Sequence, residues 1–111
     1  CPATPENKGF VNSEFISRMK DGAILINTAR GALLNESDVL TAVNSGKLAA
    51  VAVDVLDGEP PRSGHPFVGQ PHFYITSHVA CSSKESREAV IKISAANLKS
   101  FLEGGTLNRI V

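Results

Sequence analysis

The chain has 111 residues, 42% of them hydrophobic and 20% charged, and its 11 basic and 11 acidic side chains give a formal net charge of zero. This length and composition indicate one small globular domain and exclude a disordered or fibrous chain. The balanced charge argues against a nucleic-acid-binding protein, and no apolar run is long enough to suggest a membrane-spanning protein.

The first half of the chain predicts a loop, a short helix, a strand and a second helix. Residues 1–10 are rich in Pro, Asn and Gly, which is typical of a loop, and Asn12 or Ser13 can cap a short helix after it. The apolar run AILI at 23–26 predicts a strand. Asn35 can then open a helix that carries acidic residues in its first turn and stops at a glycine.

The second half predicts two more strands and a long helix. The apolar runs at 49–55 and 73–76 predict the strands, and the Pro- and Gly-rich segment between them predicts a loop. Ser82 and Glu85 have the spacing of a capping box, so a long helix is expected to run from there towards Gly104. One stripe of this helix is apolar and comprises Val90, Ile91, Ile93, Leu98 and Leu102.

All three predicted strands are solidly apolar, without alternation of apolar and polar residues. Strands of this kind are typical of a parallel sheet that helices cover on both faces, so the predicted fold class is α/β. Three strands make a thin sheet with exposed edges, and the chain starts at Cys1 rather than at a methionine. We therefore expect a fragment of a longer polypeptide whose remaining strands precede this one.

Polar residues with reactive side chains follow the three predicted strands. Arg30 comes after the first, Asp54 lies at the end of the second with Glu59 five residues later, and His78 follows the third. Ligands bind outside the carboxyl ends of the strands in open parallel sheets, so these side chains are expected at one edge. Taken singly, all but Asp54 are more often surface or structural residues, whereas a carboxylate inside an apolar run needs a partner.

Together these groups suit the reduction of a 2-keto acid. A guanidinium can bind a carboxylate and the adjacent carbonyl oxygen, and an imidazole can deliver a proton near neutral pH. A glutamate beside the imidazole would orient the ring and favour its protonated form. None of these side chains supplies a hydride, so a nicotinamide cofactor is expected.

Two other kinds of site are weaker alternatives. Cys81, near a helix start, is a candidate thiol nucleophile. His65, His72, His78 and Cys81 are candidate metal ligands, but their spacing matches no zinc pattern, so no metal is expected. The segment from His65 to Phe67 is instead expected to be a loop anchor that packs over the sheet. Two cysteines are too few for a disulfide-rich secreted scaffold, so a cytoplasmic location is favoured.

Several stretches, in order, resemble the successive signatures of the D-isomer-specific 2-hydroxyacid dehydrogenases. They are INTARG, the ALLNES that follows it, VDVLDGEPP and ITSHVA, with CPATPENKGFVN ahead of them. The resemblance covers nearly the whole chain and implies a partial Rossmann-type, doubly wound parallel sheet. Residues 1–111 would be the C-terminal part of this dinucleotide-binding domain, which the family joins to a smaller flavodoxin-like substrate domain.

The resemblance also implies an activity, the interconversion of a D-2-hydroxy acid and its 2-keto acid with NAD. Arg30 would bind the substrate, His78 would be the general acid/base, and Glu59 would orient His78. Asp54 would hydrogen-bond the nicotinamide carboxamide. The resemblance also places other residues at the cofactor, namely Cys1, Pro2, Thr28, Ala29 and Ala80. Arg30 and His78 would contact the cofactor in addition to their catalytic roles.

Two features depart from the family pattern. Ser77 stands where the family usually has a proline before the histidine, and no G-x-G-x-x-G occurs in the 111 residues. The acidic residue for the adenosine ribose and the substrate domain are missing too. We therefore expect the isolated chain to be inactive, the whole protein to be a homodimer, and the cofactor to be NAD, with NADP left open. The alternative is an NAD(H)-sensing, corepressor-like protein that acts through partner recognition, as the C-terminal-binding proteins do.

Overall fold

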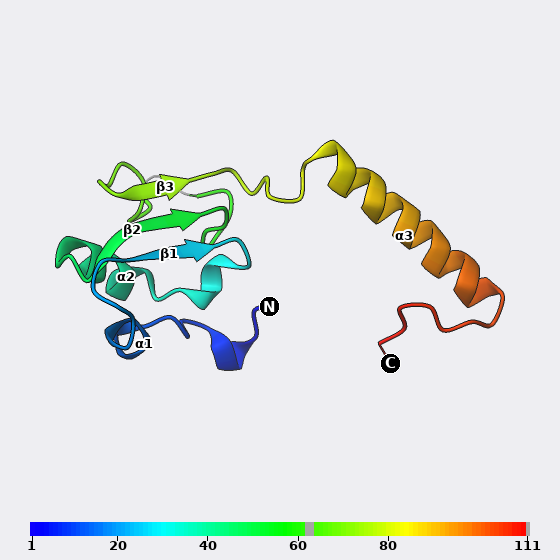
Figure 1. The fold of residues 1–111 in the computed structure, drawn as a ribbon, viewed down its shortest axis with the longest axis horizontal. Coiled ribbons are helices and arrows are strands. Elements are labelled where there is room, and N and C mark those ends of the chain that lie inside the picture. The colour runs from blue at the N-terminus through cyan, green and yellow to red at the C-terminus, as the bar shows by residue number, and fades with distance from the viewer. Residues whose placement is uncertain (62–63, 111) are drawn as a thin grey trace. The chain divides into compact units, whose positions relative to one another are not determined.

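The computed structural model describes residues 1–61 and 64–110. They form two compact units, Cys1–His78 and Val79–Val111, which we describe separately (Figure 1). In the described part of the chain, no helix has the length and apolar character needed to cross a membrane.

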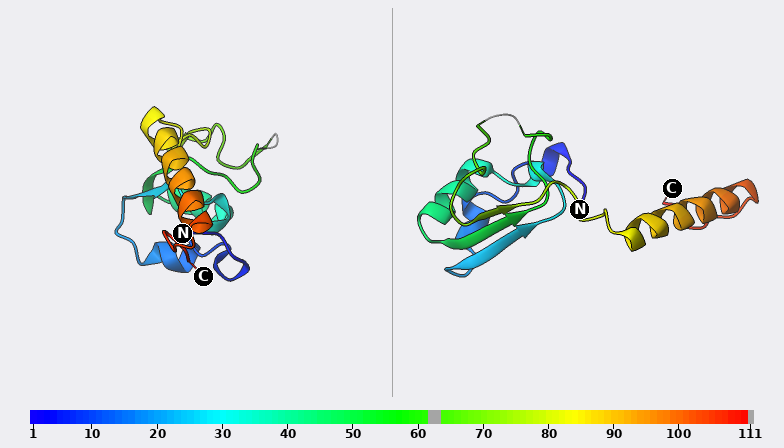
Figure 2. Two further views of the ribbon diagram at one scale, coloured as in Figure 1. Left: turned by 90° about the vertical axis from the view of Figure 1, so that its right-hand side faces the viewer. Right: turned by 90° about the horizontal axis from the view of Figure 1, so that it is seen from above.

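The first unit is a three-stranded parallel sheet with two short helices, as the α/β prediction requires. The strands lie side by side in the order β1-β2-β3 (Figures 1 and 2). In this register Asn27 pairs with Val53, and Val53 with Ile75, so the three carboxyl ends are level. The elements are a 3-10 helix Pro5–Asn7, α1 Ser13–Ser17, β1 Ala23–Asn27, a 3-10 helix Gly31–Leu33, α2 Glu36–Asn44, β2 Leu48–Val53 and β3 Phe73–Ile75.

The two short helices begin where their caps predict. The Asn12 side chain accepts a hydrogen bond from the Phe15 amide at the start of α1, and the Asn35 side chain accepts one from the Asp38 amide at the start of α2. Each cap satisfies an amide that has no partner inside its helix. β2 is shorter than the apolar run 49–55 suggests, and Asp54 therefore lies just beyond the strand.

The core of the first unit lies on one face of the sheet. Val51 and Val53 of β2 are buried there with Val39 of α2, and α1 packs on α2. Phe67 is 1% exposed and stacks on Phe73 with ring centroids 4.6 Å apart, so the predicted loop anchor is confirmed. The apolar side chains on the other face are exposed, Ile24 by 61%, Ile26 by 68% and Tyr74 by 65%.

Solidly apolar strands suit burial on both faces of the sheet. Within the first unit, α2 packs on one of these faces.

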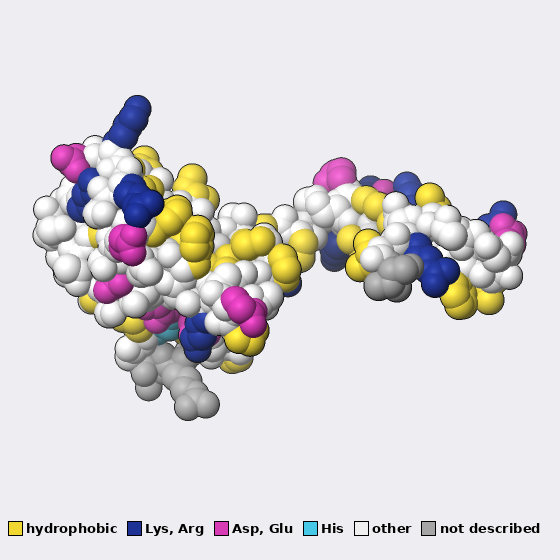
Figure 3. Space-filling model, turned by 90° about the horizontal axis from the view of Figure 1, so that it is seen from below, with side chains coloured by type: hydrophobic (Ala, Val, Ile, Leu, Met, Phe, Trp, Pro, Cys, Tyr) yellow, Lys and Arg dark blue, Asp and Glu magenta, His cyan; other side chains and the backbone are white. Residues whose placement is uncertain are grey.

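The second unit consists mainly of α3, Lys84–Leu102. The predicted capping box at Ser82 and Glu85 is wrong, because the helix begins one residue later and Ser83 is the cap, accepting from the Ser86 amide at 3.1 Å. The apolar stripe of α3 is exposed, and none of the helix residues is buried. Hydrophobic side chains are visible at the surface of both units in Figure 3.

Candidate active site

Asn27, the last residue of β1, organises the loop from Thr28 to Arg30. Its buried side chain accepts a hydrogen bond from the Ala29 amide at 3.0 Å and donates one to the Arg30 carbonyl oxygen at 2.8 Å. An asparagine that bonds its own following backbone in this way fixes a tight turn. Asn27 is absent from the predicted site residues, although an asparagine directly at the end of an apolar run is a signal for such a turn.

Asp54 connects the ends of the three strands. Its amide donates to the carbonyl oxygen of Asn27 at 3.0 Å, and its Oδ1 accepts from the hydroxyl of Thr76, which follows β3, at 2.5 Å. With only 5% of its surface exposed, the Asp54 side chain needs such a donor. The carboxylate is thereby fixed at the edge of the sheet where ligands of parallel α/β folds bind.

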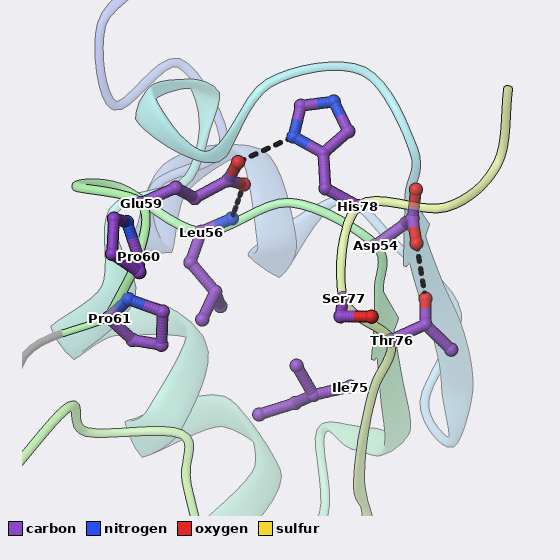
Figure 4. A pocket seen from close by; sticks show the side chains of 9 residues that line it. All are labelled: Asp54, Leu56, Glu59, Pro60, Pro61, Ile75, Thr76, Ser77 and His78. Carbon is purple, nitrogen blue, oxygen red and sulfur yellow. Dashed lines mark hydrogen bonds and ion pairs between the residues drawn. The ribbon is translucent and has the colours of Figure 1, made fainter. Parts of the chain in front are cut away.

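Glu59 and His78 meet across 19 residues of sequence. The His78 Nδ1 lies 2.5 Å from Oε2 of Glu59, and Oε1 of Glu59 accepts from the Leu56 amide at 2.7 Å (Figure 4). One carboxylate oxygen therefore holds the imidazole, while the other ties Glu59 to its own turn.

The hydrogen bond with His78, followed by the one from the Leu56 amide, lowers the pKa of Glu59 below its ordinary value of 4.5. Glu59 is therefore a carboxylate at neutral pH, and a carboxylate can only accept hydrogen bonds. The proton between the two residues belongs to Nδ1 of His78. This leaves Nε2 as the ring nitrogen that can exchange a proton with a ligand.

The backbone of His78 is in the left-handed region, with a φ of +57°. For a residue with a Cβ this conformation costs about 1–2 kcal/mol. Strained backbone of this kind concentrates at functional sites, where surrounding contacts hold it in place. The contact with Glu59 is one such restraint on His78.

Two hollows of the first unit meet at the Glu59–His78 pair. One has a volume of about 390 Å³, and its wall is partly drawn in Figure 4. It is lined by Asp54, Leu56, Glu59, Pro60, Pro61, Ile75, Thr76, Ser77 and His78. The other, of about 250 Å³, is lined by Ala3, Arg30, Gly31, Ala32, Val55, Leu56, Asp57, Glu59 and His78. The structure thus brings Arg30, Glu59 and His78 to one pocket and Asp54 to the pocket beside it.

The remaining predicted site residues are less closely integrated. Thr28 is exposed and Ala29 half-buried in the loop that Asn27 holds, and Cys1 and Pro2 are exposed. The side chain of Arg30 is exposed as well, and its Nη1 donates to the Ala29 carbonyl oxygen at 2.6 Å. Ala80 is an exposed residue of the second unit and is not part of the geometry described for the first.

The alternative sites gain nothing from the arrangement. Within residues 1–61 and 64–110, no three His, Cys, Asp or Glu side chains are grouped as a metal site requires. Cys1 and Cys81 are both exposed, free cysteines. His65 contacts Glu36, with Nε2 and Oε1 3.0 Å apart, and this contact belongs to the loop that follows Glu59.

Comparison with known proteins agrees with this geometry. Residues 1–80 match the family model of the D-isomer specific 2-hydroxyacid dehydrogenase, NAD binding domain. The chain is 44% identical over 108 residues to hydroxypyruvate reductase of Blautia hydrogenotrophica, covering 97% of this chain and 34% of that protein. It is 36% identical over 109 residues to glycerate dehydrogenase of Methylorubrum extorquens, covering 96% of this chain and 35% of that protein.

The fold has the same relatives. The whole chain superposes on 45% of a D-isomer specific 2-hydroxyacid dehydrogenase from Xanthobacter autotrophicus, solved in complex with NADPH and MES, with a TM-score of 0.84 and 28% identity. The chain spans about a third of the length of the curated relatives that it matches. The parallel strand order is the one expected of a Rossmann-type sheet, and the family model matches residues 1–80, most of the chain. This chain therefore belongs to the D-isomer specific 2-hydroxyacid dehydrogenase family and is part of its NAD-binding domain.

Proposed function

We propose that the protein to which this chain belongs interconverts a D-2-hydroxy acid and its 2-keto acid, and that Arg30, Glu59 and His78 carry out the chemistry. The observation that carries the proposal is the Glu59–His78 contact at the carboxyl ends of the strands. It is the arrangement that a histidine needs in order to act as a general acid, with an orienting carboxylate on one ring nitrogen and the other left for the substrate.

The order of events follows from these groups. The Arg30 guanidinium binds the carboxylate and the carbonyl oxygen of the keto acid, which draws electron density away from the carbonyl carbon. A reduced nicotinamide cofactor, when bound, supplies the hydride to that carbon. The imidazolium form of His78 gives its Nε2 proton to the carbonyl oxygen as that oxygen gains negative charge, while Glu59 holds the ring at Nδ1. The reverse reaction returns both the proton and the hydride.

The buried carboxylate of Asp54 supports a nicotinamide at this pocket. Asp54 presents a buried carboxylate at the pocket wall, and a carboxylate accepts hydrogen bonds from an amide such as the nicotinamide carboxamide. We propose Asp54 for this contact, with Thr28, Ala29, Cys1, Pro2 and Ala80 as the further residues along the cofactor. The cofactor proposed is NAD, with NADP open, since one relative was solved with NADPH.

Hydroxypyruvate is the first substrate to try. Two curated relatives are named hydroxypyruvate reductase and glycerate dehydrogenase, and glycerate is the hydroxy acid that corresponds to hydroxypyruvate. Both names describe reductases or dehydrogenases, which supports an enzyme over the corepressor-like sensor. We also propose that residues 1–111 form the C-terminal part of the dinucleotide-binding domain, and that the whole protein is a cytoplasmic homodimer.

The proposal is tested in the full-length protein with His78→Ala. Turnover of hydroxypyruvate with NADH should fall by about two to four decades, the usual contribution of a positioned general acid/base. Circular dichroism serves as the control for a correctly folded protein. Unchanged turnover in a folded variant would show that His78 is not the general acid.

A further inference from the structure

Glu36 and His65 form a second pair of acidic and imidazole side chains, and Glu36 contacts the turn that carries Glu59. Glu36 is the first residue of α2, and His65 lies in the loop that precedes β3. The His65 side chain is 6% exposed and that of Glu36 is 21% exposed. Neither residue is among those assigned to substrate or cofactor, so the chemistry described above does not account for this largely buried pair.

The partners of His65 fix the way its ring faces. Nδ1 accepts a hydrogen bond from the Phe67 amide at 3.3 Å, so the ring proton belongs on Nε2. Nε2 lies 3.0 Å from Oε1 of Glu36, in a close polar contact rather than a well-aligned hydrogen bond. The ring also packs edge-on against Phe67, which is in the core. His65 therefore holds one fixed position against the Glu36 carboxylate.

Glu36 in turn contacts the turn of Glu59. The same Oε1 accepts a long hydrogen bond, 3.4 Å, from the amide of Asp57. The neighbouring amide, that of Leu56, donates to Glu59 at 2.7 Å. Two successive amides of one turn therefore donate to two carboxylates, the Asp57 amide to Glu36 of α2 and the Leu56 amide to Glu59 of the turn itself.

We propose that Glu36, held by His65, is a positioning residue for the proposed general acid, because it fixes the turn whose Leu56 amide and Glu59 carboxylate orient His78. This inference rests on the function proposed for His78 and Glu59, but its structural part is independent of any turnover. If the contact with Glu36 is lost, the Asp57 amide loses its acceptor, the turn shifts, and Glu59 no longer holds Nδ1 of His78 at the observed distance.

The test compares Glu36→Leu with Glu36→Gln in the full-length protein, and the first readout is the NMR resonance of the Nδ1 proton of His78. Leucine removes the acceptor, so this proton should exchange faster with water and its resonance should broaden or disappear. Glutamine retains an acceptor oxygen for the Asp57 amide, so the resonance should remain. Lys8→Met is the matched control, because Lys8 contacts the same Asp57 only through an exposed ion pair of 3.8 Å.

The second readout is kinetic. In Glu36→Leu, kcat for hydroxypyruvate should fall by about tenfold with KM unchanged, since a misplacement of about 1 Å in a catalytic group can cost up to 10²-fold. Glu36→Gln should retain most of kcat. If even the unchanged protein reduces no keto acid, the proposed function is wrong. The NMR comparison still decides whether Glu36 positions Glu59 and His78.

Two results would overturn the inference. One is an Nδ1 resonance in Glu36→Leu that is as sharp as in the unchanged protein. The other is an equal loss of that resonance in Lys8→Met, since a general disturbance of the turn would then explain both. Should Glu36→Leu fail to fold, His65→Phe keeps a ring against Phe67 while removing the polar contact with Glu36, and the same NMR comparison applies to it.

Discussion

The two carboxylate oxygens of Glu59 have different partners, the imidazole of His78 and the amide of Leu56. The first contact orients the ring, and the second prevents the carboxylate from following the ring if it moves. These two contacts link the turn of Glu59 to His78, the proposed general acid, which follows another strand. It also makes the charge of Glu59 measurable as a contribution to stability, because both partners favour the ionised form.

The pKa of Glu59 is lowered in the folded protein, so its charge contributes to stability at a pH above its ordinary value, 4.5, and this contribution is lost as the pH falls through the lowered value. Glu59→Gln has no such charge. We expect the difference in free energy of unfolding between the unchanged protein and Glu59→Gln to be largest near neutral pH and to shrink on acidification. Urea unfolding over a series of pH values measures it. A difference that stays constant throughout the acid range would contradict the linkage.

Arg30 offers a second prediction for a single side chain. Lysine keeps the positive charge but lacks the planar fork that binds a carboxylate through two parallel hydrogen bonds. Arg30→Lys should therefore weaken capture of the keto acid by about tenfold, equivalent to about 1.4 kcal/mol and thus to one hydrogen bond to a charged group. Steady-state KM for hydroxypyruvate measures this in the full-length protein.

Arg18→Lys is the control for Arg30→Lys, because Arg18 is an exposed arginine that pairs with Glu14 on α1. It should leave KM unchanged. If the keto acid were captured equally well by the Arg30 variant, the substrate carboxylate would have to bind elsewhere.

At the scale of elements, the backbone of Gly31 packs directly against the turn after β2. Gly31 is buried, and a Cβ at this position would overlap the backbone of Leu56 and Asp57. The glycine is therefore required by space. The loop after β1, which carries Arg30, and the turn of Glu59 can lie against each other only because no side chain separates them.

Gly31→Ala should lower the free energy of unfolding by about 3 kcal/mol, the upper part of the range for overpacking, because the obstacle is backbone that cannot rotate away. Denaturant unfolding monitored by circular dichroism measures the change. Gly46→Ala is the comparison, since Gly46 has a φ of +78° and open space around it. The free energy of unfolding of that variant should fall by about 1–2 kcal/mol, the cost of an alanine in the left-handed region. Equal losses in the two variants would count against the contact with the turn.

The contrast between helix caps shows what local sequence can predict. Asn35 was the one cap expected for α2 and is the cap observed, whereas for α1 the sequence left Asn12 and Ser13 open and the structure has Asn12. At α3 two adjacent serines, Ser82 and Ser83, can each serve as a cap, and the spacing to Glu85 favours the wrong one. Nothing is buried on α3 that would select one register by packing, so short-range chemistry alone decides it.

At the scale of the whole molecule, the parallel sheet and the gathering of Arg30, Asp54, Glu59 and His78 follow from the sequence. Level strand ends are a property of parallel sheets, and each of these residues lies after a strand or close to its end. The family resemblance also predicted the pairing of Glu59 with His78, but the sequence did not predict the contacts of Asn27 and Glu36. Asn27 bonds its own following backbone, while Glu36 contacts His65, a loop residue 29 positions away, and no periodic pattern records such a contact.

The bonds of Asp54 have a consequence for the motions of the strand ends. The amides of Asp54 and Thr76 each donate to the preceding strand end, and the Thr76 hydroxyl closes the link to the Asp54 carboxylate. Because that side-chain bond joins the two residues, opening at one strand end disturbs the other. We expect both amides to exchange at one common, slow rate in hydrogen–deuterium exchange, and Thr76→Val to accelerate both together. Unequal rates would mean that the strand ends open one at a time and that the edge on which the site is built is not a single cooperative unit.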